Sequence, residues 1–230
     1  PEELPPPNIV FIMLDDLGYG ELQWYPDEEN IAEREATPND AISSPSILQL
    51  AKEGIRFTNY HSPAAVCSPA RVALLTGRYP QEFNIPDYLP DITGQGLPEG
   101  TPTIATLLRD SAGYATNLVG KWHIGNAYPR YLPVHFGFDE SWVRFGNDLY
   151  AGYKGNEFIH NDDIAGKSVL APDEHSAETI TKLAIEFLEA AESRDQPYFL
   201  NVWYRAPHYV LDPPANFPGT VAGSYNPQPF

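Results

Sequence analysis

Three apolar segments, each followed directly by polar side chains, constrain the fold of this chain more than any other feature of its sequence. They span residues 8–14, 114–119 and 198–203. Short continuous apolar runs of this kind are typical of strands buried on both faces of a parallel sheet. Such sheets bind ligands beyond the carboxyl ends of their strands. We therefore expect the polar clusters that follow the three strands to meet in one site.

Segments with helical character alternate with these strands. The sequence predicts helices from Ser44-Pro45 to Gly54, over 70–75 with Gly77 as a stop, over 103–111 and over 176–191. It also predicts a short strand over 55–60 and irregular segments over 21–43, 80–103 and 126–172. This alternation indicates an α/β fold with a mostly parallel sheet flanked by helices. We expect residues 1–230 to form a single domain of this class.

The charge and hydropathy of the chain argue against several classes of partner. Its 230 residues include 31 acidic and 14 basic side chains, which gives a formal net charge of −17. This balance disfavours nucleic acid or an anionic membrane surface as the main partner. No apolar run approaches the ~20 residues that a membrane span requires. Residues 1–7 have the character of neither a signal peptide nor a transit peptide, and we expect them to form a stiff polyproline segment.

Two adjacent carboxylates, Asp15 and Asp16, follow the first predicted strand. A solvated turn is the simpler interpretation of this dipeptide. The alternative is a cation site, because adjacent carboxylates repel one another and hard oxygen ligands suit Ca²⁺ or Mg²⁺. The dipeptide alone favours the turn.

The second and third strands are each followed by a histidine. Lys121 and His123 lie in the run 120–125, where a strand-like backbone would direct both side chains to one side with Trp122 packed behind them. Lys121 offers a positive charge for an anion, and His123 can exchange protons near neutral pH. A histidine satisfied in a turn is the alternative interpretation. His208 follows the third strand.

Cys67 is the only cysteine of the chain. It can form neither an intramolecular disulfide nor a thiolate metal cage, so it is either a small buried hydrophobe or a reactive group. Pro69 is expected to hold the peptide extended before any helix starts. Arg71 places a permanent positive charge four residues after the thiol. Cys67 would then lie just before a helix N-terminus, where the helix dipole favours negative charge.

Together, these clusters resemble the motifs of the type I sulfatases, the formylglycine-dependent and arylsulfatase-like enzymes. The matching elements are Cys67-Ser68-Pro69-Ala70-Arg71 followed by Leu75-Thr76-Gly77-Arg78, the Asp15-Asp16 pair, Gly120-Lys121-Trp122-His123-Ile124-Gly125, and Ala206-Pro207-His208. The last match is looser, because the family often continues with Thr-Pro where this chain has Tyr209-Val210. The stretch 135–139 also resembles a family segment, which we interpret as structural. The resemblance implies an alkaline-phosphatase/sulfatase-like fold.

The resemblance also implies roles for single residues. A formylglycine-generating or other sulfatase-maturing enzyme would oxidise Cys67 to formylglycine, whose hydrate is the nucleophile. Asp15, Asp16 and the group derived from Cys67 would bind a divalent cation, usually Ca²⁺, with Mg²⁺ possible. Lys121 and His208 would contact the sulfate, and His208 would protonate the leaving alcohol. Lys121 and Arg71 would stabilise the negative charge that develops during attack. His123 would assist the formylglycine hydrate.

The resemblance extends from residue 8 to about residue 214 and covers only the N-terminal part of a usual sulfatase. We therefore expect a chain truncated at its C-terminus. In the family, the later part supplies an Asp-Asn pair that completes the cation site and a second sulfate-binding lysine, and neither has a candidate here. The resemblance further implies a location outside the cytoplasm, whether periplasmic, secreted or lysosomal.

The function expected from the sequence is hydrolysis of a sulfate ester, either a sulfated carbohydrate or an aryl sulfate. Two alternatives stay open. One is a phosphate or phosphonate monoester hydrolase of the same superfamily, and the other is a non-catalytic domain that binds sulfated glycans or a protein partner. Any anionic substrate would require a locally positive pocket inside this acidic chain.

Overall fold

The computed structural model of the chain describes residues 5–18, 44–90, 94–125, 128–144, 157–163, 168–169 and 175–208. The chain forms two compact units. The larger combines residues 1–15 with 63–230, and the smaller comprises residues 16–62. The irregular segment predicted over 21–43 lies outside the described residues.

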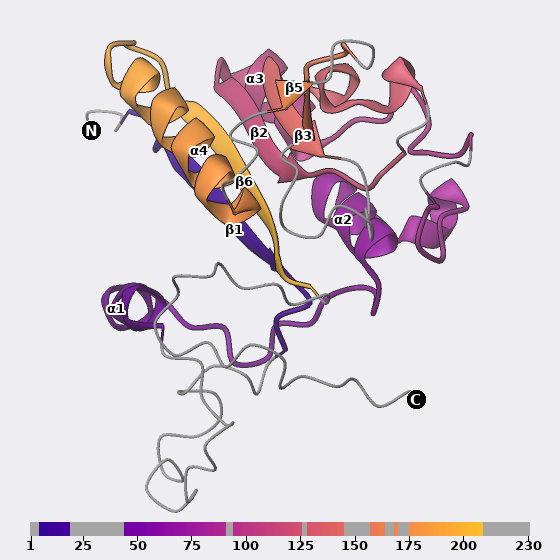
Figure 1. Ribbon diagram of the computed structural model, residues 1–230, viewed down its shortest axis with the longest axis horizontal. Coiled ribbons are helices and arrows are strands. Elements are labelled where there is room, and N and C mark those ends of the chain that lie inside the picture. The colour runs from indigo at the N-terminus through magenta and orange to yellow at the C-terminus, as the bar shows by residue number, and fades with distance from the viewer. Residues whose placement is uncertain are drawn as a thin grey trace, which may run out of the picture. The chain divides into compact units, whose positions relative to one another are not determined.

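A six-stranded sheet in the order β1-β6-β2-β3-β4-β5 organises the described part of the larger unit (Figure 1). Its strands are β1 (Ile9–Asp15), β2 (Ala115–Lys121), β3 (Glu140–Arg144), β4 (Glu157–His160), β5 (Ser168–Val169) and β6 (Tyr198–Pro207). The first four strands in this order run parallel to one another, whereas β4 and β5 are antiparallel to their neighbours. The sheet is mostly parallel and flanked by helices, which confirms the predicted fold class.

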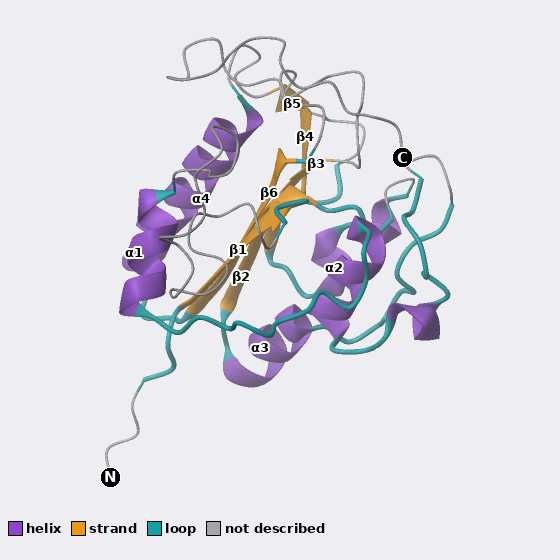
Figure 2. Cartoon of the chain, turned by 90° about the horizontal axis from the view of Figure 1, so that it is seen from below, coloured by secondary structure: helices purple, strands orange, loops and turns teal. Residues whose placement is uncertain are grey.

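Helices cover both faces of this sheet (Figure 2). One face carries α4 (Ser176–Glu192), whose apolar stripe packs on β2 and β6. The other face carries α2 (Cys67–Thr76) and α3 (Ile104–Ala112), which share a larger core with the sheet. The helices predicted over 176–191 and 103–111 thus form, and Thr103 caps the second of them, since its Oγ1 accepts from the Thr106 amide at 3.0 Å. None of the helices in the described residues is long and apolar enough to cross a membrane.

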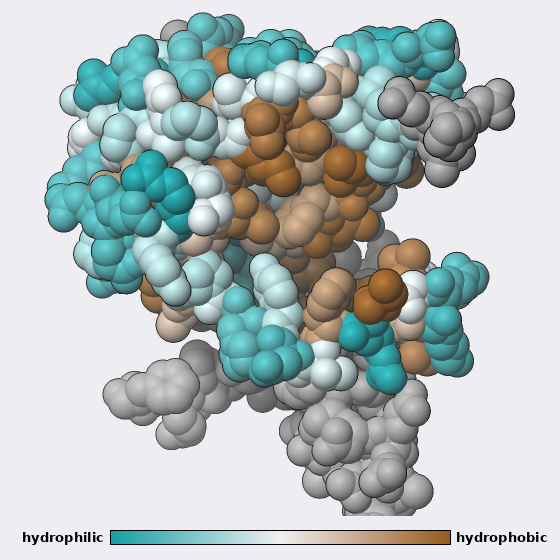
Figure 3. All heavy atoms as spheres, turned by 180° about the vertical axis from the view of Figure 1, so that it is seen from behind, coloured by the Kyte–Doolittle hydropathy of each residue, from teal (hydrophilic) through white to brown (hydrophobic). Residues whose placement is uncertain are grey.

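The prediction that β1 is buried on both faces is wrong. Val10 and Ile12 are 45% and 55% exposed, and they lie beside Leu200 and Val202 on the face that α4 covers. Strand β1 is at the edge of the sheet, whereas α4 packs over β6 and β2. An apolar run therefore identified the strand but not its neighbours. Figure 3 shows apolar side chains gathered on the surface seen from behind Figure 1.

Helix α2 begins earlier than the sequence predicts. Cys67 is its first residue, Val66 precedes it with extended backbone, and Gly77 ends it in the left-handed conformation at φ +65°. Pro69 is therefore inside the first helical turn rather than in an extended segment before it. A proline is tolerated there because the first amides of a helix have no intrahelical acceptor.

Other predicted elements have mixed outcomes. In the smaller unit, α1 (Pro45–Glu53) forms as predicted between Ser44 and Gly54, but residues 55–60 form no strand and expose Ile55 and Phe57. Strands β3, β4 and β5 lie in the range 126–172, whose weak periodicity did not reveal them. The range 80–103 contains a short 3-10 helix, η1 (Pro80–Phe83), and two further ones follow β2, η2 (Pro129–Tyr131) and η3 (Pro133–Phe136).

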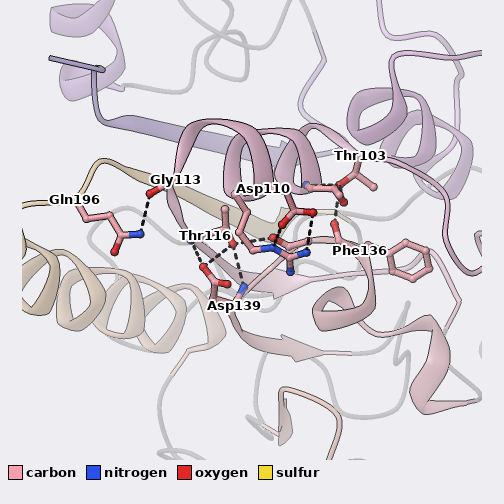
Figure 4. A network of polar contacts seen from close by, with 10 residues as sticks. Thr103, Asp110, Gly113, Thr116, Phe136, Asp139 and Gln196 are labelled. Carbon is pink, nitrogen blue, oxygen red and sulfur yellow. Dashed lines mark hydrogen bonds and ion pairs between the residues drawn. The ribbon is translucent and has the colours of Figure 1, made fainter. Parts of the chain in front are cut away.

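The stretch 135–139 joins α3 to the start of β2 through a network of polar contacts (Figure 4). Thr103 Oγ1 donates to the Phe136 carbonyl at 2.6 Å, and Thr116 Oγ1 donates to the Gly137 carbonyl at 2.7 Å. Asp139 Oδ2 accepts from the Thr116 amide at 2.9 Å. Gly137 has φ +94°, and a Cβ there would lie 2.2 Å from the backbone nitrogen of Thr106. These contacts agree with a structural role for the stretch.

Replacing Gly137 by alanine is expected to lower the free energy of unfolding by roughly 3 kcal/mol, because strain at positive φ adds to a clash with backbone. Gly100→Ala is the matched control, since Gly100 also has positive φ but a Cβ there would meet nothing within 4 Å. The control is expected to lose only about 1 kcal/mol. Urea unfolding measures both values, and equal losses would show that close packing at Gly137 is unimportant.

Candidate active site

The carboxyl ends of the three neighbouring strands β1, β6 and β2 bring the predicted polar clusters together. Asp15 ends β1, Lys121 ends β2, and His208 directly follows β6. Asp15 is in register with Pro207, so the ends of β1 and β6 meet. Helix α2 adds Cys67 at its start and Arg71 one turn later, linked to this edge by contacts with β1 and β2. The edge thus gathers every predicted site residue of the larger unit.

The thiol of Cys67 is paired with the imidazole of His123. Cys67 Sγ lies 3.0 Å from His123 Nδ1, and His123 Nε2 lies 3.0 Å from the carbonyl oxygen of Leu89. A carbonyl oxygen only accepts hydrogen bonds, so Nε2 must carry the ring proton. Nδ1 consequently offers its lone pair to the group at position 67. This geometry makes His123 a proton acceptor from residue 67.

His123 is held in its neutral form. Burial lowers the pKa of its imidazole from 6.5 to about 3, and the positive charges of Lys121 and Arg71 act in the same direction. The charge of Asp15 and the hydrogen bond to Leu89 oppose this shift without reversing it. An imidazole that stays neutral at physiological pH is available as a base.

The backbone that carries His123 is not strand-like, in contrast to the prediction. Strand β2 ends at Lys121, and His123 has the left-handed φ of +57°. The alternation argument for residues 121 and 123 therefore does not apply, although both side chains are buried at the same edge. Trp122 packs in the core as predicted, stacked on Trp203 with ring centroids 5.9 Å apart.

A buried ion cluster joins β1, β2 and α2. Arg71 donates to Asp15 Oδ1 at 3.1 Å, and Lys121 Nζ donates to Asp15 Oδ2. Arg71 also donates to the carbonyl of Lys121, and its guanidinium lies 5.0 Å from the ring centroid of Trp203. Asp15 is 6% exposed, and each cation is 1% exposed. Among the described residues of this cluster, two cations face one carboxylate, so that part of the edge carries more positive than negative charge although the chain is acidic.

Opposing effects act on the Asp15 carboxyl. Burial by itself raises its pKa, but the positive charges of Arg71 and Lys121, the hydrogen bond from Lys121 and the charge of His208 together lower it below 3.8. Asp15 is therefore ionised at neutral pH. His208 follows Pro207, which is in register with Asp15, and it is 5% exposed.

The described residues do not form a complete site for a divalent cation. Both oxygens of Asp15 accept hydrogen bonds from cationic side chains, and Asp16 is exposed and belongs to the smaller unit. No group of three histidine, cysteine or acidic side chains able to hold a metal ion occurs in the described part of the chain. Ca²⁺ requires 6–8 oxygen ligands, far more than Asp15 can offer.

Sequence reasoning missed two residues of this site. Leu89 contributes its backbone carbonyl to His123, and Ser68 Oγ accepts from the Leu89 amide at 2.9 Å. A backbone carbonyl has no signature in a sequence, whereas Ser68 is visible within the cysteine motif. His61, His160 and His175, which matched no motif, contact Asn59, Glu140 and the Ala177 amide respectively.

A thiol beside a neutral imidazole, with buried cations at the carboxyl edge of a mostly parallel sheet, is an arrangement compatible with the binding of an anionic ligand. The sequence model of the sulfatase family matches residues 7–229. The chain belongs to the sulfatase family, and its fold is the alkaline-phosphatase-like fold of that family.

Curated relatives are similar along much of this chain. Arylsulfatase A from Homo sapiens is 40% identical over 135 residues, which are 58% of this chain and 24% of the relative. N-acetylgalactosamine-6-sulfatase from Mus musculus is 30% identical over 241 residues, which are 96% of this chain and 44% of the relative. The chain therefore spans less than half the length of these relatives.

Solved structures are likewise similar to most of this chain, and their chains are longer than it. Ps i-CgsB in complex with k-i-k-neocarrahexaose superposes with a TM-score of 0.73 at 27% identity, covering 90% of this chain and 46% of that one. BT4656 in complex with its substrate D-glucosamine-2-N,6-O-disulfate superposes with a TM-score of 0.64 at 27% identity, covering 88% and 35%.

Asp15→Asn is expected to destabilise the protein by about 3–5 kcal/mol, because it removes the carboxylate that pairs with the buried Arg71 and Lys121. Asp110→Asn is the matched control, because Asp110 pairs with Arg109 at the surface. The control is expected to change the free energy of unfolding little, since exposed ion pairs contribute little. Similar losses in both variants, measured by urea unfolding, would contradict a dominant role for the buried cluster.

His123 is expected to make the protein less stable in acid. Between pH 6.5 and about 3 the unfolded chain binds a proton that the folded protein does not. The free energy of unfolding should therefore fall by about 1.4 kcal/mol for each pH unit of acidification in that range. His123→Gln should remove this component from the pH dependence measured by urea unfolding. An unchanged slope in the variant would mean that His123 titrates normally in the folded protein.

Proposed function

We propose that this chain carries the nucleophile and acid–base residues of a sulfatase that hydrolyses sulfate esters to an alcohol and sulfate. The proposal includes oxidation of Cys67 to formylglycine by a maturing enzyme. The hydrated aldehyde supplies two hydroxyls on one carbon, one to attack sulfur and one to expel sulfate afterwards. The observation that carries the proposal is the 3.0 Å contact between Cys67 Sγ and the proton-accepting Nδ1 of His123.

His123 is the base of the proposed reaction. Its Nδ1 takes the proton of the second hydroxyl, the bond between the residue-67 carbon and the sulfate oxygen breaks, and the aldehyde returns. The fixed Nε2–H tautomer and the pKa of about 3 keep this lone pair available. Since the imidazole is neutral, it also adds no charge until it receives the proton.

Lys121 and Arg71 supply positive charge for the sulfate group. Negative charge develops on the sulfuryl oxygens during attack, and fixed buried cations stabilise such charge strongly. Arg71 donates hydrogen bonds to Asp15 and to the Lys121 carbonyl, so we propose that it holds Lys121 in place in addition to supplying its own charge. Lys121 is the residue that we propose contacts the sulfate group directly.

His208 is the proposed acid for the leaving alcohol. It follows β6, the strand between those that end at Asp15 and Lys121. Its protonated imidazole would give a proton to the ester oxygen as the bond from sulfur to that oxygen breaks. The family assignment of this histidine supports the proposal.

The proposal also includes a divalent cation, Ca²⁺ or alternatively Mg²⁺, which Asp15, Asp16 and residue 67 would help to bind. The described residues are too few to hold it, so we assign no step of the reaction to it. An extracytoplasmic location likewise belongs to the proposal, because it rests on the family resemblance.

We propose a sulfated carbohydrate as the substrate class, with an aryl sulfate as the alternative. The carbohydrate ligands of Ps i-CgsB and BT4656 support this choice, since both proteins superpose on about nine tenths of this chain. The locally positive edge formed by Arg71 and Lys121 is compatible with an anionic ester.

Mass spectrometry and paired assays test the proposed function. The protein, produced together with a formylglycine-generating enzyme, should yield a residue-67 peptide that has lost its sulfur, and it should release sulfate from a sulfate ester. Cys67→Ala should abolish turnover, and His123→Ala should reduce it by about 10²–10⁴-fold. The control Asp110→Asn, a surface change, should leave turnover unaltered.

Three results would contradict the proposal. A residue-67 peptide that keeps its sulfur in an active protein would exclude formylglycine as the nucleophile. Faster hydrolysis of the matched phosphate or phosphonate ester would favour a phosphate or phosphonate monoester hydrolase of the same superfamily. Binding of sulfated glycans without any turnover would identify a non-catalytic domain.

A further inference from the structure

We propose that Ser68 is a positioning residue that fixes the tautomer of His123 through the backbone of Leu89. The inference rests on the proposed function for its kinetic consequence, but the tautomer itself can be measured without any reaction. Ser68 directly follows residue 67, which contacts Nδ1 of His123. The Ser68 hydroxyl instead acts through Leu89 on Nε2, the other nitrogen of the ring.

Two hydrogen bonds on one residue connect Ser68 to His123. The Leu89 amide donates to Ser68 Oγ at 2.9 Å, and the Leu89 carbonyl accepts from His123 Nε2 at 3.0 Å. Ser68 is fully buried, and Leu89 is 4% exposed. Water therefore does not readily replace either hydrogen bond, and the two bonds hold the Leu89 backbone from both of its polar sides.

Apolar side chains hold the same segment in the core. Ile85 and Leu89 are 2% and 4% exposed and belong to the core cluster that also contains Val72 of α2. The Ile85 amide donates to the Pro80 carbonyl at 3.1 Å, which closes the turn after η1. Two buried apolar anchors and one buried hydroxyl thus fix a loop segment that the sequence predicts only as irregular.

The consequence is chemical as well as structural. His123 can accept a proton from residue 67 only while its Nδ1 lone pair is free, which requires the proton on Nε2. The Leu89 carbonyl selects that tautomer, because it can only accept a hydrogen bond. Ser68 keeps this carbonyl in place. Loss of its hydroxyl should therefore allow His123 to adopt both neutral tautomers, without removing any group that touches substrate.

Nitrogen-15 NMR of the imidazole tests this inference directly. In the wild-type protein at neutral pH, His123 should show a protonated Nε2 and an unprotonated Nδ1, with its signals assigned by their absence from His123→Gln. In Ser68→Ala, the two nitrogens should shift toward a mixture of tautomers. A folded Ser68→Ala variant with the wild-type pattern would overturn the inference.

A second pair of variants separates the hydroxyl from the shape of the side chain. Ser68→Thr keeps a hydroxyl and Ser68→Val replaces it by a methyl group, so the two side chains have nearly equal volume. Thr should retain the wild-type tautomer, and Val should lose it, even if Ala fails to fold. The same tautomer in both variants would contradict a role for the hydroxyl.

Thr103→Ala is the matched control for loss of a buried hydroxyl. Thr103 is 3% exposed and accepts from the Thr106 amide at 3.0 Å, but it lies at the start of α3 within the network of Figure 4. This variant should be less stable and still show the wild-type His123 pattern. A shifted pattern in Thr103→Ala would mean that general destabilisation, rather than Ser68, controls the tautomer.

Kinetics add the link to the proposed reaction. For an active protein, Ser68→Ala should lower kcat about 10-fold to 100-fold with KM little changed, and Ser68→Thr should restore kcat. A raised KM with unchanged kcat would contradict a role in positioning the base. If the wild-type protein hydrolyses no ester, the proposed function fails while the NMR result still decides the role of Ser68.

Discussion

The Asp15 carboxylate, shared by Arg71 and Lys121, is the interaction on which the arrangement of the site depends. It connects the end of β1, the first turns of α2 and the end of β2, which are distant in sequence. Burying three charges is costly, and it is tolerable only because they are paired and the Asp15 pKa is lowered so that it stays ionised. The cluster therefore connects the three elements, and within the described residues it places two positive charges and one negative charge near residue 67.

Burial, reinforced by these positive charges, explains why His123 is neutral. Burial and the nearby cations lower its pKa together, so the imidazole stays neutral in a site suited to an anion. The hydrogen bond to Leu89 then decides which nitrogen of the neutral ring is free. In the proposed reaction, the charges that would attract a sulfate group thus also help burial to keep the His123 imidazole unprotonated.

The sequence predicted those features of the site that depend only on which residue types are present and in what order. Apolar runs identified β1, β2 and β6, and the rule for parallel sheets correctly brought Asp15, Lys121 and His208 to one edge. The features that it could not predict depend on which elements lie side by side in the sheet and on the conformation and hydrogen bonds of the backbone. The exposure of Val10 and Ile12 follows from the place of β1 in the sheet, the direction of His123 follows from its φ of +57°, and the Leu89 carbonyl has no signature of its own.

The central claim is that His123 accepts the proton whose removal expels sulfate from residue 67. The most direct test is mass spectrometry of the residue-67 peptide from the matured His123→Ala variant after incubation with a sulfate ester. A covalent sulfate on residue 67 is expected in this variant, because attack on sulfur can still occur while expulsion is slow. An inactive variant whose residue 67 carries no sulfate, compared with an active wild-type protein, would contradict it.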